Sequence, residues 1–215
     1  MTWLKDGERY SRLENNKQTG GTDIVAYRAK DNSREVIIPS SLLTDKSTGR
    51  PIPVRSVSWS ADNEKVLIYN NTRRVWRYDT RGDYWVLNLK DGALRQLGKG
   101  MPESSMMFAK FSPDGTRVAY VSNNNIYVED IDSGKITQLT KDGSDTIVNG
   151  TFDWVYEEEF SCRDGFRWSP DGKHIAYWQS DTKGTGVFDI INNVDSIYAK
   201  VTISHTPRQE PPIQP

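Results

Sequence analysis

Residues 168–178 read WSPDGKHIAYW, and this short stretch decides the fold because the chain repeats it. Residues 111–121 read FSPDGTRVAYV, residues 59–69 read WSADNEKVLIY, and a fainter copy, WLKDG, covers residues 3–7. The copies begin at residues 3, 59, 111 and 168, so the period is 52 to 57 residues. Self-similarity at a fixed period indicates a repeat architecture, in which each repeat is one structural unit.

Each copy is typical of a β-hairpin. The aromatic residue ends one strand, Ser-Pro-Asp-Gly forms a tight turn, and the β-branched and aromatic run that follows is the returning strand. A second hairpin follows in the same repeat, as in residues 84–97, where Lys90-Asp91-Gly92 separates two strand-like runs. Two hairpins make a four-stranded antiparallel sheet, and such sheets at a period of about 50 residues are typical of β-propeller blades.

The sequence therefore predicts an all-β fold, namely about four four-stranded antiparallel blades that form part of a larger β-propeller. No segment shows the sustained apolar stripe of a long helix. We expect a partial propeller over residues 1–203, followed by a Pro-rich tail over residues 204–215. The expected blades lie near residues 3–43, 54–98, 106–140 and 164–203.

Composition excludes several classes of function. The 28 basic and 29 acidic residues leave a net charge of −1, which argues against a protein that binds nucleic acid by neutralising phosphates. The single Cys162 excludes an internal disulfide and a cysteine zinc site, and 2 histidines leave little for a histidine site. The sequence has no Gly-x-Ser-x-Gly nucleophile elbow and no glycine-rich phosphate loop. We therefore expect no catalytic residue, no metal and no cofactor in these residues.

The first interruption of the repeat is residues 70–83. It holds four arginines, among them Arg77, interleaved with Trp76 and Tyr78. This combination suits an anion, a carbonyl group or a base, and a strand with one solvated basic face is the alternative that the residues leave open. We expect Arg81-Gly82-Asp83 to form the hairpin turn at the end of this stretch.

The second interruption contains residues 153–160, DWVYEEEF, in which three adjacent carboxylates are flanked by aromatic residues. Packing of the aromatic side chains should fix the acids on the rim of the propeller. Two fixed carboxylates suit an ammonium group, because each of its three N–H donors needs an acceptor. A solvated acidic loop is the alternative here.

Residues 153–159, DWVYEEE, resemble the double-glutamate motif in the propeller domain of the dipeptidyl peptidase IV family of serine exopeptidases. The similarity continues through residues 163–172, RDGFRWSPDG, and covers residues 73–77, RRVWR, and 125–128, NIYV. It implies an eight-bladed propeller followed by an α/β-hydrolase domain that removes dipeptides from peptide N-termini. By position, it implies that Glu158 and Glu159 bind the free α-amino group of the substrate. It also implies that Arg77 hydrogen-bonds the carbonyl between the first two substrate residues.

The resemblance also bears on partners and compartment. It implies a peptide N-terminus and an α/β-hydrolase domain as partners, and that domain is absent from these 215 residues. Unpaired edge strands of a partial propeller predict homo-oligomerisation, and no nucleic-acid partner is expected. Members of the family are secreted, periplasmic or membrane-anchored, whereas these residues show no leader and no membrane-spanning run.

Two functions follow as expectations. The favoured one is the substrate-gating propeller portion of a dipeptidyl-peptidase-IV-like exopeptidase, which anchors the free N-terminus of a peptide and has no catalytic activity of its own. The alternative is a free-standing propeller-type module that binds a protein or a peptide.

Overall fold

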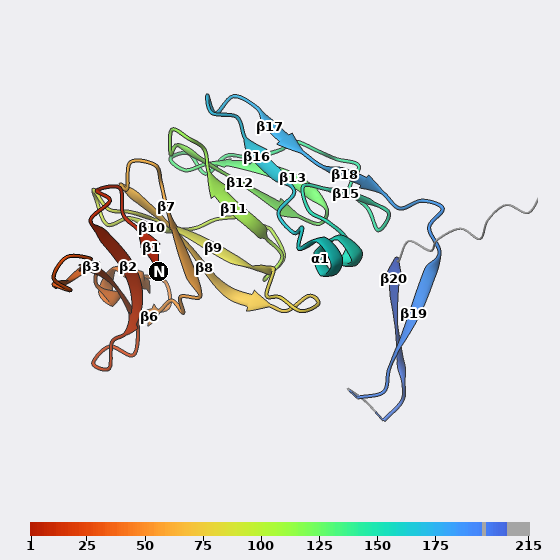
Figure 1. Ribbon diagram of the computed structural model, residues 1–215, viewed down its shortest axis with the longest axis horizontal. Coiled ribbons are helices and arrows are strands. Elements are labelled where there is room, and N and C mark those ends of the chain that lie inside the picture. Colours follow the sequence, from red (N-terminus) through yellow and green to blue (C-terminus); the bar gives the residue numbers. More distant parts are fainter. Residues whose placement is uncertain (195–196, 206–215) are drawn as a thin grey trace, which may run out of the picture.

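The computed structural model describes residues 1–194 and 197–205, so residues 206–215 of the tail predicted at 204–215 lie outside the described residues. Three four-stranded antiparallel sheets follow one another along the chain, and Figure 1 shows them side by side. The first, in the order β1-β2-β3-β4, comprises Thr2–Trp3, Arg9–Asn15, Thr22–Arg28 and Arg34–Ile38. The second, in the order β10-β9-β8-β7, comprises Ser56–Trp59 (β7), Lys65–Arg73 (β8), Arg81–Asn88 (β9) and Leu94–Gln96 (β10). The third, in the order β11-β12-β13-β14, comprises Met107–Phe111, Arg117–Ser122, Asn125–Asp130 and Ile136–Gln138.

The remaining elements are short. A 3-10 helix, Ser40–Leu43, and the β5–β6 hairpin, Thr44–Asp45 and Arg50–Pro51, join the first sheet to the second. In the fourth repeat, β16 (Phe166–Trp168) pairs with β17 (Ile175–Tyr177), while β18 (Gln179–Asp181) pairs with the earlier β15 (Ile147–Asn149). The helix α1 (Trp154–Phe160) lies between β15 and β16 in the sequence. The hairpin of β19 (Val187–Asn192) and β20 (Lys200–His205) projects away from the sheets (Figure 1). An all-β fold built of antiparallel blades is thus confirmed.

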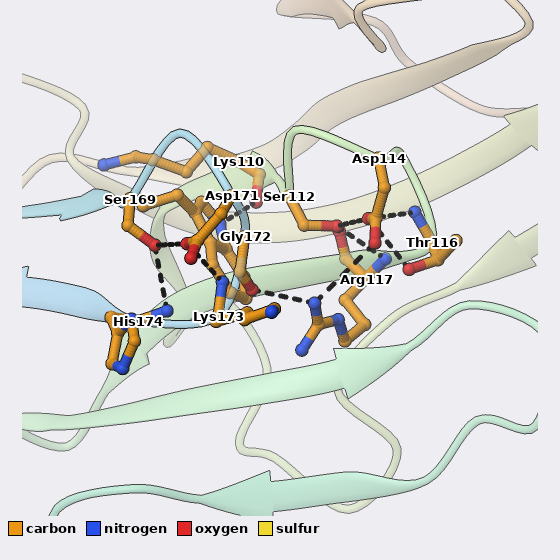
Figure 2. A network of polar contacts seen from close by, with 11 residues as sticks. Lys110, Ser112, Asp114, Thr116, Arg117, Ser169, Asp171, Gly172, Lys173 and His174 are labelled. Carbon is orange, nitrogen blue, oxygen red and sulfur yellow. Dashed lines mark hydrogen bonds and ion pairs between the residues drawn. The ribbon is translucent and has the colours of Figure 1, made fainter.

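The repeated Ser-x-Asp turns have one hydrogen-bonding pattern, which Figure 2 shows for two of them. Ser112 Oγ accepts a hydrogen bond from the Arg117 backbone N–H at 3.0 Å and lies 2.5 Å from Asp114 Oδ1. The hydrogen bond from Ser112 is the largest of the effects that lower the pKa of Asp114 to about 2. Ser169 repeats the arrangement with Asp171 at 2.5 Å. The tight turn is thus as the repeat predicts, and the structure adds that the Ser and Asp side chains close it.

Side chains near these turns also join the third sheet to the fourth repeat. The Arg117 guanidinium donates a hydrogen bond to the Gly172 carbonyl at 2.8 Å, which Figure 2 also shows. The same guanidinium lies 5.2 Å from the centroid of the Trp168 ring. In return, Trp168 Nε1 donates to the Lys110 carbonyl at 3.3 Å. Each contact runs from one blade to the next.

The hydrophobic core is divided in the same way. One cluster of buried side chains joins the second sheet to the third, and includes Leu67, Tyr84, Val118 and Tyr120. A second cluster joins the first sheet to the second, and a third cluster packs Phe166 of the fourth repeat against the third sheet. Since burial of apolar surface is the main stabilising term, each blade depends on its neighbours for stability.

Candidate functional site

The arginine-rich interruption is an extension of the β8–β9 hairpin. Its register shifts after Asn70, which pairs with Asp83, and the ladder then resumes at Arg73, which pairs with Arg81. Residues 74–80 form the tip, which the Val75 backbone N–H closes by donating to the Tyr78 carbonyl at 3.1 Å. The hairpin tip therefore carries Trp76 and Arg77 beyond the end of the sheet.

The prediction of a hairpin turn at Arg81-Gly82-Asp83 is wrong. These residues belong to β9, and Gly82 forms a β-bridge with Met106 of the next blade. The glycine serves a close approach instead. A Cβ atom at position 82 would lie 2.4 Å from the Tyr69 ring and 2.6 Å from the Asn70 carbonyl oxygen. Glycine is typical both of turns and of such close packing, and only the partners across the strand distinguish the two cases.

Asp79 anchors the C-terminal end of the hairpin tip. The Tyr69 hydroxyl donates to the Asp79 carbonyl at 2.8 Å, and the Asp79 carboxylate lies 3.3 Å from Arg55. Burial of the Tyr69 hydroxyl raises its pKa to about 12, and the charge of Asp79 adds to this effect. The tip is thereby tied to the sheet from which it extends.

The acidic interruption folds as the seven-residue helix α1, which the sequence reasoning missed. The Asp153 side chain caps the helix by accepting a hydrogen bond from the Tyr156 backbone N–H at 3.0 Å. The helix ends at Phe160, and Ser161 caps it with a φ of 55°, which lies in the left-handed region. Trp154, Val155 and Tyr156 favour strands, so the sequence pattern does not indicate a helix here. The Asp153 cap and the three glutamates favour the helix that the structure shows.

The helix turns its three glutamates in three directions, because successive residues differ by about 100° around a helix axis. Glu157 points inward and is 3% exposed. The Glu158 side chain is 5% exposed and faces the hairpin tip, whereas Glu159 is exposed to solvent. The alternative of a solvated acidic loop is therefore wrong for two of the three acids.

Arg77 and Glu158 form a close ion pair through Nε and Oε2. The structure thus brings together two of the three predicted site residues, one from the second sheet and one from the helix that follows the third sheet. The third, Glu159, is the adjacent helix residue, and no hydrogen bond or ion pair holds its side chain within the described part of the chain. The Arg77 side chain remains 75% exposed, so its outer face is open to a ligand.

Unsatisfied polar atoms gather at this place. Among the described residues, the buried side-chain nitrogen and oxygen atoms without a hydrogen-bond partner are Asn70 Oδ1, Thr80 Oγ1, Glu157 Oε1, Glu158 Oε1 and Arg163 Nη1. Asn70 precedes the hairpin tip, Thr80 is its last residue, and the other three atoms lie on α1 or just after it. Each such atom costs about 1–3 kcal/mol. They lie in two segments that meet, and each such atom calls for a physical explanation, of which a polar ligand or ordered water at this contact is one.

Two glycines fix the base of α1. The Gly150 N–H donates to the Trp178 carbonyl at 2.9 Å, the Trp178 N–H to the Gly165 carbonyl at 2.9 Å, and the Gly165 N–H to the Gly150 carbonyl at 3.0 Å. A Cβ atom at Gly165 would lie 2.9 Å from the Gly150 carbonyl carbon. The chain therefore leaves the blades at Gly150 and returns at Gly165, with α1 held between them.

Two further classes of site are not observed. Residues 1–194 and 197–205 contain no group of three or more His, Cys, Asp or Glu residues arranged to hold a metal ion. No helix in these residues is long and apolar enough to cross a membrane.

Successive antiparallel blades, with an acidic helix and an arginine hairpin at one end, define the chain as part of a β-propeller domain. Residues 60–208 match the family described as the dipeptidyl peptidase IV (DPP IV) N-terminal region. The chain belongs to this family, as the double-glutamate motif predicts.

Individual relatives agree with this assignment. The chain is 36% identical over 135 residues to a probable dipeptidyl-aminopeptidase B of Chaetomium globosum, a match that covers 62% of the chain and 15% of the relative. It is 28% identical over 187 residues to the probable dipeptidyl-aminopeptidase B of Aspergillus oryzae, covering 86% and 20%. The crystal structure of Porphyromonas gingivalis dipeptidyl peptidase 4 superposes with a TM-score of 0.79 at 25% identity, covering 96% of this chain and 28% of that one. The chain therefore spans a fifth or less of the length of these two fungal relatives.

Proposed function

We propose that the chain binds the free N-terminus of a peptide at the contact between the hairpin tip and α1. The observation that carries the proposal is the state of Glu158. Its side chain is almost fully buried, one carboxylate oxygen pairs with Arg77, and the other has no partner. An ammonium group would supply the missing donor, and membership of the dipeptidyl peptidase IV N-terminal family supports a peptide as its source.

Glu159 and Arg77 have separate roles in the proposed site. Glu159 is exposed one residue along the helix, so it offers a second carboxylate to the same ammonium from the solvent side. Arg77 uses one edge of its guanidinium for Glu158 and keeps the other N–H groups for a peptide carbonyl. Within a longer chain that carries a hydrolase domain, an anchored amine would present one particular peptide bond to the nucleophile, which is the substrate gating that we propose.

Titration of the 215-residue chain with a short peptide tests this proposal. The peptide Ala-Pro-Ala is added with its amine free or acetylated, and binding is followed by NMR. The free peptide should bind and the acetylated peptide should not. Binding should weaken as the pH rises through the amine pKa of about 8, because the ammonium loses its charge.

Substitutions in the same titration identify the acceptors. Glu158→Gln and Glu159→Gln should each lower the affinity by about 10- to 100-fold, since hydrogen bonds to charged groups contribute about 1.5–3 kcal/mol. The matched control is Glu14→Gln, which removes a carboxylate that pairs with Arg34 at 2.9 Å in the first sheet. Its affinity should equal that of the native chain. Equal binding of free and acetylated peptides would instead favour a general peptide-binding module.

A further inference from the structure

Arg163 contacts the hairpin tip from the segment that follows α1. Its guanidinium carbon lies 3.7 Å from the centroid of the Tyr78 ring, within the range of a cation–π interaction. Tyr78 is the neighbour of Arg77 in the hairpin tip and is 46% exposed. Like the Arg77–Glu158 ion pair, this contact joins the hairpin tip to the part of the chain that contains α1 and the residues directly after it.

The same guanidinium acts on α1. Nη1 of Arg163 is buried without a hydrogen-bond partner, and so is Oε1 of Glu157 on the inward face of the helix. Burial raises the pKa of the Glu157 carboxyl, and the positive charge of Arg163 opposes this rise. Arg163 therefore stacks on a hairpin residue adjacent to Arg77, and its charge favours the ionised form of a helix residue adjacent to Glu158.

The backbone of Arg163 is fixed independently of the site. The Thr151 hydroxyl donates to the Arg163 carbonyl at 3.0 Å, and Thr151 forms an antiparallel bridge with Asp164. The side chain thus projects from a backbone that the base of α1 holds in place. A planar guanidinium is suited to this position, because it stacks on an aromatic face and stays charged when partly buried.

We propose that Arg163 is a positioning residue that sets the separation of Arg77 and Glu158 by stacking on Tyr78 of the hairpin tip from a backbone that is fixed at the base of α1. This inference rests on the proposed function only for its effect on peptide binding. Arg163 touches no ligand in this scheme. Its loss leaves every proposed ligand-binding group in the chain and changes only the distance between them.

The first test is the peptide titration with Arg163→Gln, which removes the charge and the stacking plane. Affinity for the free-amine peptide should fall about 5- to 10-fold, the equivalent of a cation–π contact of about 1–1.4 kcal/mol. Arg163→Lys keeps the charge and should lose less, while Tyr78→Phe keeps the ring and should bind within about twofold of the native chain. The matched control is Arg117→Gln, which removes another stacked arginine, over Trp168, away from the site. It should reduce stability and leave affinity unchanged.

The second test needs no peptide. A double-mutant cycle with Arg77→Ala and Glu158→Gln, followed by urea denaturation, measures the coupling between these two side chains. The coupling should fall by at least half when the cycle is repeated in the Arg163→Gln chain. An unchanged coupling would overturn the positioning role, whatever the peptide does. If the native chain binds no peptide but the coupling falls, the proposed function fails and the positioning role stands.

Discussion

Gly150→Ala is the substitution that most directly tests whether the base of α1 is rigid. Gly150 is buried at a φ of 73°, and an added Cβ would lie 2.9 Å from side-chain carbons of Val121 and Ile126. Both of these neighbours are fully buried in the third sheet. The substitution therefore combines backbone strain with overpacking of a core.

The two costs can be separated with a matched glycine. Gly20 has nearly the same φ, 70°, but a Cβ added there would meet nothing within 4 Å. Gly20→Ala should cost only the backbone term of about 1–2 kcal/mol. Gly150→Ala should cost that term plus about 1–3 kcal/mol for overpacking.

The assay is thermal and urea denaturation of the three chains. For a chain of this length, about 1 kcal/mol corresponds to roughly 2–4 °C in Tm, so Gly150→Ala should melt about 2–12 °C below Gly20→Ala. Equal stability of the two variants would refute the reasoning, because it would mean that Val121 and Ile126 give way. In that case the position of α1 is not fixed by Gly150.

Three further predictions concern titratable groups. Burial lowers the pKa of Lys110 to about 8, below its ordinary 10.5, so the unfolded chain binds the extra proton between these values. The free energy of unfolding should therefore rise with pH in that interval by up to about 1.4 kcal/mol per unit, relative to Lys110→Met, in urea denaturation. Burial raises the pKa of Glu129 above 4.5, so the stability of the native chain relative to Glu129→Gln should fall as the pH rises above 4.5, which the same assay measures. Ser112→Ala should raise the pKa of Asp114 from about 2 toward 3.8, because its strongest hydrogen bond is lost, and an NMR titration of the carboxyl follows this change.

The repeats and turns were predictable because their causes are local. The hydrogen bonds that close one hairpin turn join Ser112, Asp114 and Arg117, which all lie within six consecutive residues. The local sequence is therefore enough to specify the turn. The helix α1 was not predictable in the same way, since strand-favouring residues occupy its first turn. The pairing of β15 with β18 was also missed, because it joins segments that α1 and a whole hairpin separate.

The site was predictable only in part. The resemblance to the dipeptidyl peptidase IV family pointed to Arg77, Glu158 and Glu159, and the structure brings the first two into contact. No local pattern points to Arg163, because its partner Tyr78 lies in a different blade. Glu157 points inward because it lies on a helix. Without the helix, the sequence of three adjacent glutamates does not show which of them is buried.

The hairpin tip belongs to the second sheet, α1 is held at the far side of the third, and the core clusters on either side of the third sheet set the angles between them. The distance between Arg77 and Glu158 therefore depends on two angles between blades, one between the second and third sheets and one between the third sheet and the fourth repeat. A substitution in either cluster that tilts one blade should weaken the ion pair without touching it. A second substitution that tilts the next blade in the opposite sense should restore it. Suppressor pairs for a defect at this contact are therefore to be sought in the apolar interior, on opposite faces of the third sheet.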